Sequence, residues 1–231
     1  MFIHHSHFTK NLSSNLAVSE IKKLWQIKAV GPKSILEMRA IQAGKPIITK
    51  LFKGDEFCST NELKQAFEDR AIKLNKEGYN IYTVMNPIKA TFTGHSVGDD
   101  DIDYRDLLLI DIDRANTSKE PANETELVAA EILGKEISNY LNKNGWGDPI
   151  NMLSGNGYHL YYILNKLPND DIHTALIKNL LKELATKFNN DVVKVDAVVY
   201  NASRITKVPG TIAYKGAASE SRPYRMARVL S

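Results

Sequence analysis

The stretch Leu107-Leu108-Leu109-Ile110-Asp111-Ile112-Asp113 decides the fold. Its uninterrupted apolar run is typical of a strand that is covered on both faces. Strand periodicity places Asp111 and Asp113 on one face and Ile112 on the other. Two like charges at the end of a sheet repel each other unless a cation lies between them, and oxygen ligands favour Mg²⁺ or Mn²⁺. The pair therefore predicts a divalent metal site, and a helix cap is the simpler alternative.

A glycine turn lies downstream, at Ser154-Gly155-Asn156-Gly157, and a strand rich in aromatic residues follows it at 158–163. We expect both glycines of the turn, Gly155 and Gly157, to adopt positive φ angles and to let a ligand approach the backbone, as a phosphate-binding turn requires. Strand alternation puts His159 and Tyr161 on one side. Ser154 and His159 can then both reach an anionic group above the glycines. A plain hairpin turn and a structural histidine are the alternatives.

A third segment, Val192–Tyr200, reads as an apolar strand that carries one acidic residue, Asp196. A carboxylate amid apolar residues is costly unless it is paired or binds a metal, so Asp196 is a candidate third ligand. The alternative is an edge carboxylate that faces water. The next stretch carries Arg204 and Lys207 and then turns at Pro209-Gly210. For these two cations, the alternative is a solvated strand face.

In order and spacing, the three segments resemble the motifs of the archaeo-eukaryotic primase superfamily, in particular the primase-polymerases of phages, plasmids and CRISPR-associated loci. The matching residues are Asp111 and Asp113 in the first motif, Ser154 and His159 in the second, and Val195-Asp196 in the third. Arg204 and Val208-Pro209-Gly210-Thr211 also resemble a run that many members carry after the third motif. The likeness spans roughly residues 35–214.

The resemblance implies an α+β archaeo-eukaryotic primase fold, in which an N-terminal αβ module packs on an RRM-like module with the active site between them. It implies a DNA primase or DNA polymerase that transfers nucleotides from nucleoside triphosphates to a primer on a single-stranded DNA template. Two Mg²⁺ or Mn²⁺ ions would stabilise the attacking and leaving oxygens. The implied metal ligands and catalytic residues are Asp111, Asp113 and Asp196. The implied nucleotide-binding residues are Ser154, Gly155, Gly157, His159, Arg204 and Lys207.

Other functions use similar residues. A template-independent nucleotidyltransferase or a metal-dependent phosphodiesterase would need the same carboxylates. A catalytically inactive module that binds nucleic acid in replication or CRISPR adaptation is the alternative from another class. The intact set of Asp, His and Asp favours an enzyme, because a binding module does not need several carboxylates around an anionic ligand. A helicase or CRISPR adaptation proteins are possible fused or associated partners.

Composition sets further bounds. The chain has 231 residues, of which 43% are hydrophobic and 25% charged, as is ordinary for a soluble globular protein. Cys58 is the only cysteine, which excludes an intramolecular disulfide and a multi-cysteine zinc module. No apolar stretch approaches the roughly 20 residues of a membrane span, and no secretory signal is recognisable. We therefore expect a cytoplasmic protein with no membrane partner.

Charge is distributed unevenly although the net charge is only +3. Residues 99–113 contain seven Asp and one Arg, whereas residues 201–231 contain six Lys or Arg and one Glu. Such asymmetry suits metal binding at one place and phosphate binding at another. Arg222, Arg225 and Arg228 are candidate contacts to the nucleic-acid backbone. A basic tail that crosses to another domain is an equally good interpretation.

The length of 231 residues favours a single domain over residues 1–231. The resemblance implies that it is a catalytic domain with a helical extension (about 1–30), an αβ module (about 31–98) and an RRM-like module (about 105–220), and we expect the chain to be a fragment of a longer protein. Expected helices are 15–29, 60–77, 124–144 and 170–189, and expected strands before the aspartate pair are 35–41, 46–52 and 79–85. Residues 87–106 have few periodic apolar residues and predict a long loop or flap. The run Asp99-Asp100-Asp101 within it should be solvated and mobile.

Overall fold

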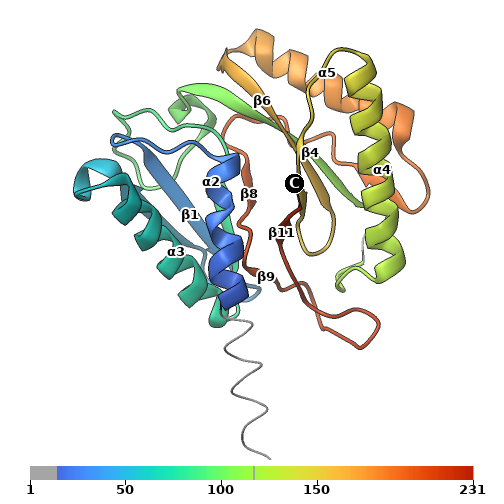
Figure 1. Cartoon of the computed structure of the whole chain (residues 1–231), viewed down its shortest axis with the longest axis horizontal. Coiled ribbons are helices and arrows are strands. Elements are labelled where there is room, and N and C mark those ends of the chain that lie inside the picture. Colours follow the sequence, from blue (N-terminus) through green and yellow to red (C-terminus); the bar gives the residue numbers. More distant parts are fainter. Residues whose placement is uncertain (1–14, 117, 231) are drawn as a thin grey trace, which may run out of the picture.

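Two antiparallel sheets form the framework of the protein (Figure 1). The structure is a computed structural model that describes residues 15–116 and 118–230. One sheet has four strands in the order β2-β1-β3-β8, and the other has five in the order β11-β5-β6-β4-β7. The mixed α+β class expected from the sequence is confirmed. Residues 1–14 of the predicted extension 1–30 lie outside the described residues.

The first sheet is built from β1 (Ile35–Ile41), β2 (Ile48–Lys53), β3 (Asn80–Val84) and β8 (Ile205–Lys207). The short 3₁₀ helix η1 (Gly54–Glu56) and α3 (Thr60–Lys76) connect β2 to β3. Ser59 caps α3, because its hydroxyl accepts a hydrogen bond from the Glu62 N–H. Ile81 packs with Phe67 of α3 in the core of this half. Its neighbours Asn80 and Tyr82 point to the opposite face, so one face of β3 is free for a site.

The N-terminal helical region packs on the same core as α3. Residues 15–22 are helical, and α2 (Leu24–Ile27) follows after a turn at Lys23. The single helix expected over 15–29 is therefore interrupted. Ile21 and Leu24 are buried in the core that α3 covers. No helix in the described ranges combines the length and apolarity that a bilayer-spanning helix requires.

The second sheet contains a βαββαβ unit, the arrangement expected for an RRM-like module. Its elements in chain order are β4 (Tyr104–Arg114), α4 (Glu124–Lys143), β5 (Ile150–Leu153), β6 (Tyr158–Pro168), α5 (Asp171–Phe188) and β7 (Val193–Val195). Both helices lie on one side of this sheet (Figure 1). Ile110 and Ile112 are buried in the core with Leu133 of α4 and Leu181 of α5. The alternate residues of β4 consequently face the other sheet.

The division of the chain between the sheets differs from the expected one. β8 lies within residues 105–220 but pairs with β3 in the first sheet. β11 (Arg228–Val229) lies beyond residue 220 but pairs with β5 in the second sheet. The strand expected over 192–200 is also shorter, because it ends at Val195. There the Asp196 carboxylate accepts the Val198 N–H and turns the chain toward the first sheet.

One buried amide links the two sheets at their junction. The Asn86 side chain donates to the carbonyl of Ala202 and accepts the N–H groups of Asp106 and Leu107, at distances of 2.9–3.0 Å. Asn86 is fully buried. It therefore fixes the end of β3, the start of β4 and the approach to β8 relative to one another.

The segment between β3 and β4 is anchored and is not a free flap. Ile88 and Ile102 form a bridge, and Phe92 and Val97 are buried in a small core with Val84. Asp99 begins the 3₁₀ helix η2 (Asp99–Asp101), and its carboxylate accepts both the N–H and the hydroxyl of Ser203 at 2.7 Å. The apolar residues that anchor the segment are single and widely spaced, so they form no periodic pattern in the sequence.

The C-terminal segment is attached to the first half by two asparagines. It contains the hairpin of β9 (Ile212–Ala213) and β10 (Arg225–Met226). The Asn75 side chain pairs with both the N–H and the carbonyl of Ile212, and the Asn80 side chain does the same with Tyr214. These amides replace the backbone hydrogen bonds that a neighbouring strand would make.

The carboxylate of Glu126 on α4 anchors the segment that leads into β10. Arg222 donates to Glu126 at 2.8 Å, and Asn116 and the Asn123 N–H donate to the same carboxylate. Burial alone would raise the pKa of Glu126, but these hydrogen bonds outweigh it and lower the pKa from 4.5 to about 2. The loop before α4 and the C-terminal segment are thus joined through one ionised group.

We predict that this carboxylate makes the protein sensitive to acid. A lowered native pKa gives stability that is complete above about pH 4.5 and is lost as the pH falls toward 2, because the unfolded state takes up the proton first. Glu126→Gln should lower the free energy of unfolding at pH 7 by about 1–3 kcal/mol. The free energy of unfolding of this variant should also decrease less between pH 4.5 and 2 than that of the wild-type protein. Urea unfolding of both proteins across this pH range measures the effect, and equal slopes would contradict it.

Candidate active site

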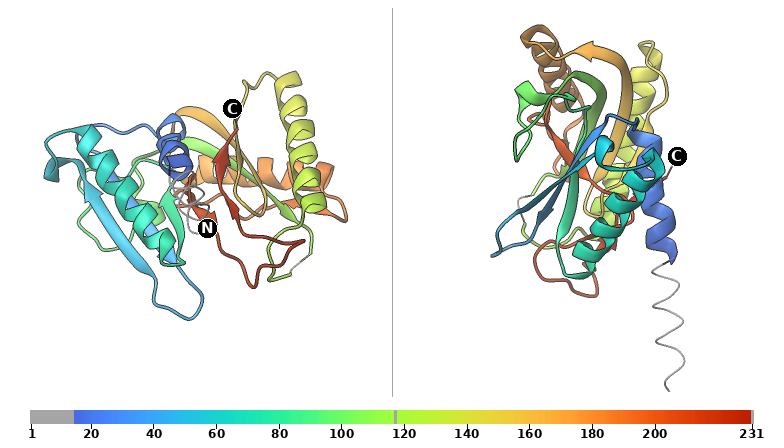
Figure 2. Two further views of the ribbon diagram at one scale, coloured as in Figure 1. Left: turned by 60° about the horizontal axis from the view of Figure 1, so that its bottom comes forward. Right: turned by 90° about the vertical axis from the view of Figure 1, so that its left-hand side faces the viewer.

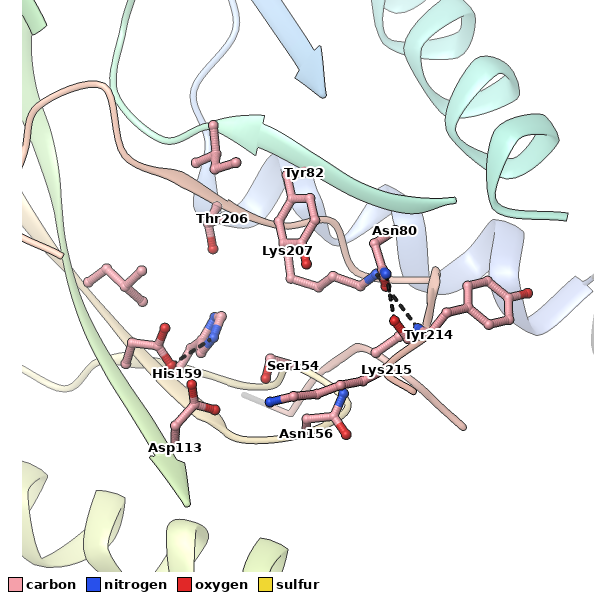
Figure 3. Close-up of a pocket in the computed structure, with 14 residues that line it drawn as sticks. Asn80, Tyr82, Asp113, Ser154, Asn156, His159, Thr206, Lys207, Tyr214 and Lys215 are labelled. Carbon is pink, nitrogen blue, oxygen red and sulfur yellow. Dashed lines mark hydrogen bonds and ion pairs between the residues drawn. The ribbon is translucent and has the colours of Figure 1, made fainter. Parts of the chain in front are cut away.

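A cavity of about 330 Å³ lies between the two sheets (Figure 3). Its walls come from β3 and β8 of the first sheet, from β4 and β6 of the second, and from the segment after β9. Its polar lining residues are Asn80, Tyr82, Asp111, Asp113, Ser154, Asn156, His159, Thr206, Lys207, Tyr214 and Lys215. The first two sequence motifs therefore meet in one cavity, at the place where the two halves face each other.

Strand register brings Asp111 and His159 together. The two residues are directly opposite in the β4–β6 pair, so their side chains project side by side from the sheet. His159 Nε2 lies 3.3 Å from Asp111 Oδ1. This carboxylate oxygen is nevertheless buried without an aligned hydrogen bond. Such an oxygen has a lone pair available for a further ligand.

His159 is held from behind by the first sheet. Its Nδ1 is 2.9 Å from the hydroxyl of Tyr161, and that hydroxyl is 2.5 Å from Thr206 Oγ1 on β8. Tyr161 is almost completely buried. The chain of hydrogen bonds fixes the imidazole ring and directs Nε2 toward the aspartate pair. The expectation that His159 and Tyr161 share one side of their strand is confirmed.

The aspartate pair is electrostatically strained. Burial and the neighbouring charge of Asp111 raise the pKa of Asp113 to about 6. Burial also opposes ionisation of Asp111, but the adjacent His159 outweighs it and lowers the pKa of that carboxyl. One carboxylate of the pair therefore ionises readily and the second with difficulty. A bound cation would relieve this repulsion.

Two lysines reach the cavity from the other direction. Lys207 is buried, and burial lowers its pKa to about 7. Its ammonium group donates to Asn80 Oδ1 at 3.2 Å and to the carbonyl of Ile212 at 3.0 Å, and no carboxylate pairs with it among the described residues. Lys215 extends from the hairpin toward Asp113 (Figure 3). The cavity thus has carboxylates on one side and, on the other, the Lys207 ammonium group, which has no carboxylate partner in the described part of the chain.

The glycines of the turn have different roles from those expected. Gly155 has a φ of 99°, but Gly157 has no positive φ. A Cβ on Gly157 would lie 2.4 Å from the carbonyl oxygen of Ile112 and 2.6 Å from Asp113 Oδ1. The turn therefore packs against the end of β4, and a glycine is needed there for close approach to protein atoms. Ser154 Oγ accepts the Gly157 N–H, which leaves its hydroxyl hydrogen to donate into the cavity.

The third motif lies beside this cavity. Asp196 and Asp113 line a neighbouring cavity, and Asp196 Oδ2 lies 3.9 Å from Arg204. The Asp196 N–H donates to the carbonyl of Asp111, so the backbones of the two motifs touch. Within the described ranges, no three His, Cys, Asp or Glu side chains converge on one point. Asp111 and Asp113 fit a cation by their mutual repulsion and by the Asp111 Oδ1 atom that lacks an aligned hydrogen bond, and Asp196 is the remaining carboxylate of the motif set.

The three C-terminal arginines lie apart from the cavity lining. Arg222 pairs with Glu126, and Arg225 donates to the carbonyl of Ala122 and lies 3.4 Å from Glu124. Arg228 is exposed on β11. The first two side chains thus have partners within the chain, and their binding to nucleic acid stays a prediction.

Sequence reasoning missed several residues of the site. Tyr82 and Asn80 come from β3, Thr206 from β8, and Lys215 from the hairpin. The alternation of Asn80 and Tyr82 with the buried Ile81 was the available signal for a second wall. This alternation can be assigned to a site only when the pairing of β3 with β8 is known, and these strands are more than a hundred residues apart in the chain.

Comparisons with known proteins bear on the fold. No model of a protein family matches the sequence, and no curated protein matches it significantly. A solved structure that is similar is the polymerase domain of Ligase D from Mycobacterium tuberculosis in complex with DNA. The TM-score is 0.51 at 12% sequence identity, and the match covers 94% of this chain and 80% of that chain. The chain therefore shares the fold of this polymerase domain.

We predict that Gly157→Ala destabilises the protein. Its new methyl group must displace the end of β4 and the Asp113 carboxylate, and such overpacking costs about 1–3 kcal/mol. Gly147→Ala is the matched control, because no atom lies within 4 Å of its Cβ position, and we expect a change within about 0.5 kcal/mol. Urea unfolding measures both, and equal values for the two variants would refute the packing role.

Proposed function

We propose that this chain is a nucleotidyltransferase of the primase-polymerase kind, which extends a nucleic-acid strand from nucleoside triphosphates. One observation carries the proposal: a cavity between two sheets has paired carboxylates on one side and, on the other, a buried lysine that no carboxylate of the described residues pairs with. A triphosphate has a charged tail that would neutralise Lys207 and an α-phosphate that a cation could link to Asp111 and Asp113. The shared fold with a DNA-bound polymerase domain supports a DNA template and primer as partners.

The chemistry would be an in-line displacement. The 3′ oxygen of the strand forms a bond to the α-phosphorus, and the bond from that phosphorus to the bridging oxygen breaks. Pyrophosphate leaves with the electron pair, and the hydroxyl proton passes to water. Ser154 and His159 would donate hydrogen bonds to phosphate oxygens. The positive charge of Lys207 would stabilise the negative charge that develops on the leaving pyrophosphate. Arg204 lies beside Asp196 and would add positive charge near the reacting phosphate.

Divalent cations belong to this proposal. Asp111, Asp113 and Asp196 would hold Mg²⁺ or Mn²⁺, which supplies charge neutralisation at the α-phosphate and activates the attacking oxygen. The unmatched oxygen of Asp111 and the raised pKa of Asp113 support such binding. Synthesis in replication, repair or CRISPR-associated pathways is the biological role that we propose with it.

The first test is nucleotide incorporation. Asp111→Asn and Asp113→Asn keep side-chain size but remove the charge, and each should lower incorporation by about 10²–10³-fold or more. Asp191→Asn, at an exposed position outside the cavity, is the matched control and should keep full activity. Labelled nucleotides on primed and unprimed DNA, with Mg²⁺ or Mn²⁺, give the rates.

The same assay separates the alternatives. Activity on primed DNA alone indicates extension, and activity without template indicates a template-independent transferase. Binding of DNA by the wild-type protein without any incorporation would identify an inactive module. Full activity in either Asn variant would rule out the proposed site.

The second test uses the pH dependence of nucleotide binding. Lys207 is protonated in the free protein below about pH 7, so nucleotide affinity should fall as the pH rises above 7, by up to about tenfold per pH unit. Lys207→Met is similar in volume and should bind weakly at all pH values without this fall. It should remain folded, because a buried charge is removed without creating an unpaired carboxylate.

Isothermal titration of both proteins with a nucleoside triphosphate between pH 6 and 9 makes the comparison. Titration of the ligand's own phosphate affects both proteins equally, so their difference reports on Lys207. Parallel profiles would show that Lys207 does not contact the nucleotide.

A further inference from the structure

The hydroxyl of Tyr161 lies behind the imidazole of His159, outside the set of residues that line the cavity. It is 2.9 Å from His159 Nδ1 and 2.5 Å from Thr206 Oγ1. Tyr161 comes from β6 and Thr206 from β8, so this hydroxyl joins the two halves of the molecule, which lie side by side in Figure 2. Burial raises the pKa of Tyr161 well above its usual range, so the hydroxyl keeps its proton.

The contact at Nδ1 restricts the position of the other ring nitrogen, Nε2. The imidazole ring is rigid, so a hydrogen bond at Nδ1 fixes the direction in which Nε2 points. Nε2 lies 3.3 Å from Asp111 Oδ1, whereas an N–H···O bond to a carboxylate is normally about 2.7–2.9 Å long. Asp111 Oδ1 is buried and has no aligned hydrogen bond. His159 is therefore close to Asp111 without making an aligned hydrogen bond to it.

An aligned bond between His159 and Asp111 would engage two groups that the proposed function needs. A cation would have to compete with the imidazole for Asp111 Oδ1, and the Nε2–H group would not be free to donate to a phosphate oxygen. A buried carboxylate attracts a neighbouring N–H group, so another contact must hold the imidazole back. Among the described residues, the Tyr161 hydroxyl is the only hydrogen-bond partner of His159 Nδ1.

We propose that Tyr161 is a positioning residue that holds His159 apart from Asp111, so that the aspartate oxygen stays open to a cation and the imidazole N–H to a phosphate. This inference rests on the proposed function and goes beyond it, because it assigns a role to a residue outside the cavity lining. Thr206 anchors the tyrosine hydroxyl from the opposite sheet. The imidazole therefore takes this orientation only when the two halves are packed together.

Titration of the free protein with Mn²⁺, without nucleotide or DNA, gives the first readout. Tyr161→Phe should weaken Mn²⁺ binding by about 10–100-fold, the usual loss when a group that supports a metal ligand is removed. Tyr162→Phe is the matched control, because Tyr162 is also buried on β6 but packs against Trp146 on the opposite face. This control should change the Mn²⁺ affinity by less than about twofold.

A double-mutant cycle separates positioning from a general structural role. In the His159→Ala background, Tyr161→Phe should leave the Mn²⁺ affinity unchanged, because no imidazole remains to engage Asp111. The same loss of affinity in both backgrounds would contradict the proposal. Tyr161→Phe/Thr206→Val replaces both hydroxyls by apolar groups of similar shape, so it should fold even if the single variant does not. It should lose Mn²⁺ affinity to the same extent.

NMR of the ¹⁵N-labelled histidine rings in the absence of metal tests the geometry directly. The Nε2–H signal of His159 is identified by its loss in His159→Ala. In Tyr161→Phe its proton should move downfield, because the N–H forms an aligned bond with Asp111, and in Tyr162→Phe it should stay in place. An unchanged signal in Tyr161→Phe would overturn the proposal. A wild-type protein that binds no Mn²⁺ would refute the metal site of the proposed function, and the NMR comparison would still decide the role of Tyr161.

Discussion

The confinement of two carboxylates at the end of one strand is the constraint on which the rest of the structure depends. Asp111 and Asp113 share one face of β4 because Ile110 and Ile112 are buried beneath α4 and α5 on the other. The pair cannot turn away from each other without unpacking that core. Burial and the repulsion within the pair together raise the pKa of Asp113. Around the pair, the fold places His159 by strand register, Lys207 from β8 and Lys215 from the C-terminal hairpin.

Polar side chains perform much of the assembly between the two sheets. The Asn86 amide joins β3, β4 and the approach to β8, and the Asn75 and Asn80 amides attach the hairpin. An amide offers a donor and an acceptor in one plane, so it can imitate a strand neighbour without continuing a sheet. This arrangement leaves the facing sheet surfaces open between the attachment points. Directed hydrogen bonds of these amides thus join the halves around the cavity.

Local patterns predicted much of this architecture, and non-local ones did not. The apolar run before Asp111, the helices with their caps, and the alternation of His159 and Tyr161 all follow from period and residue type, which depend on neighbours in the chain. The short strands β8 and β11 could not be predicted in this way, because their three and two residues, respectively, carry too little pattern to identify a partner sheet. The role of Gly157 was also misassigned: a glycine required for close approach looks the same in sequence whether the neighbour is a ligand or a strand. Lys207 was named from the sequence, but the wall formed by Asn80 and Tyr82 depends on the long-range β3–β8 pairing and could not be predicted for that reason.

The pairing of β3 with β8 also determines the order in which the protein can be completed during translation. The register Tyr82–Lys207 means that the first sheet acquires its last strand only after more than a hundred further residues have left the ribosome. Until then, β3 has an unpaired edge, and the chain can form the βαββαβ unit first because those contacts are closer in sequence. Chain order therefore allows the carboxylates to lie on a folded sheet before Lys207 faces them. A nascent chain in that state would have the acidic half of the cavity without its cationic wall.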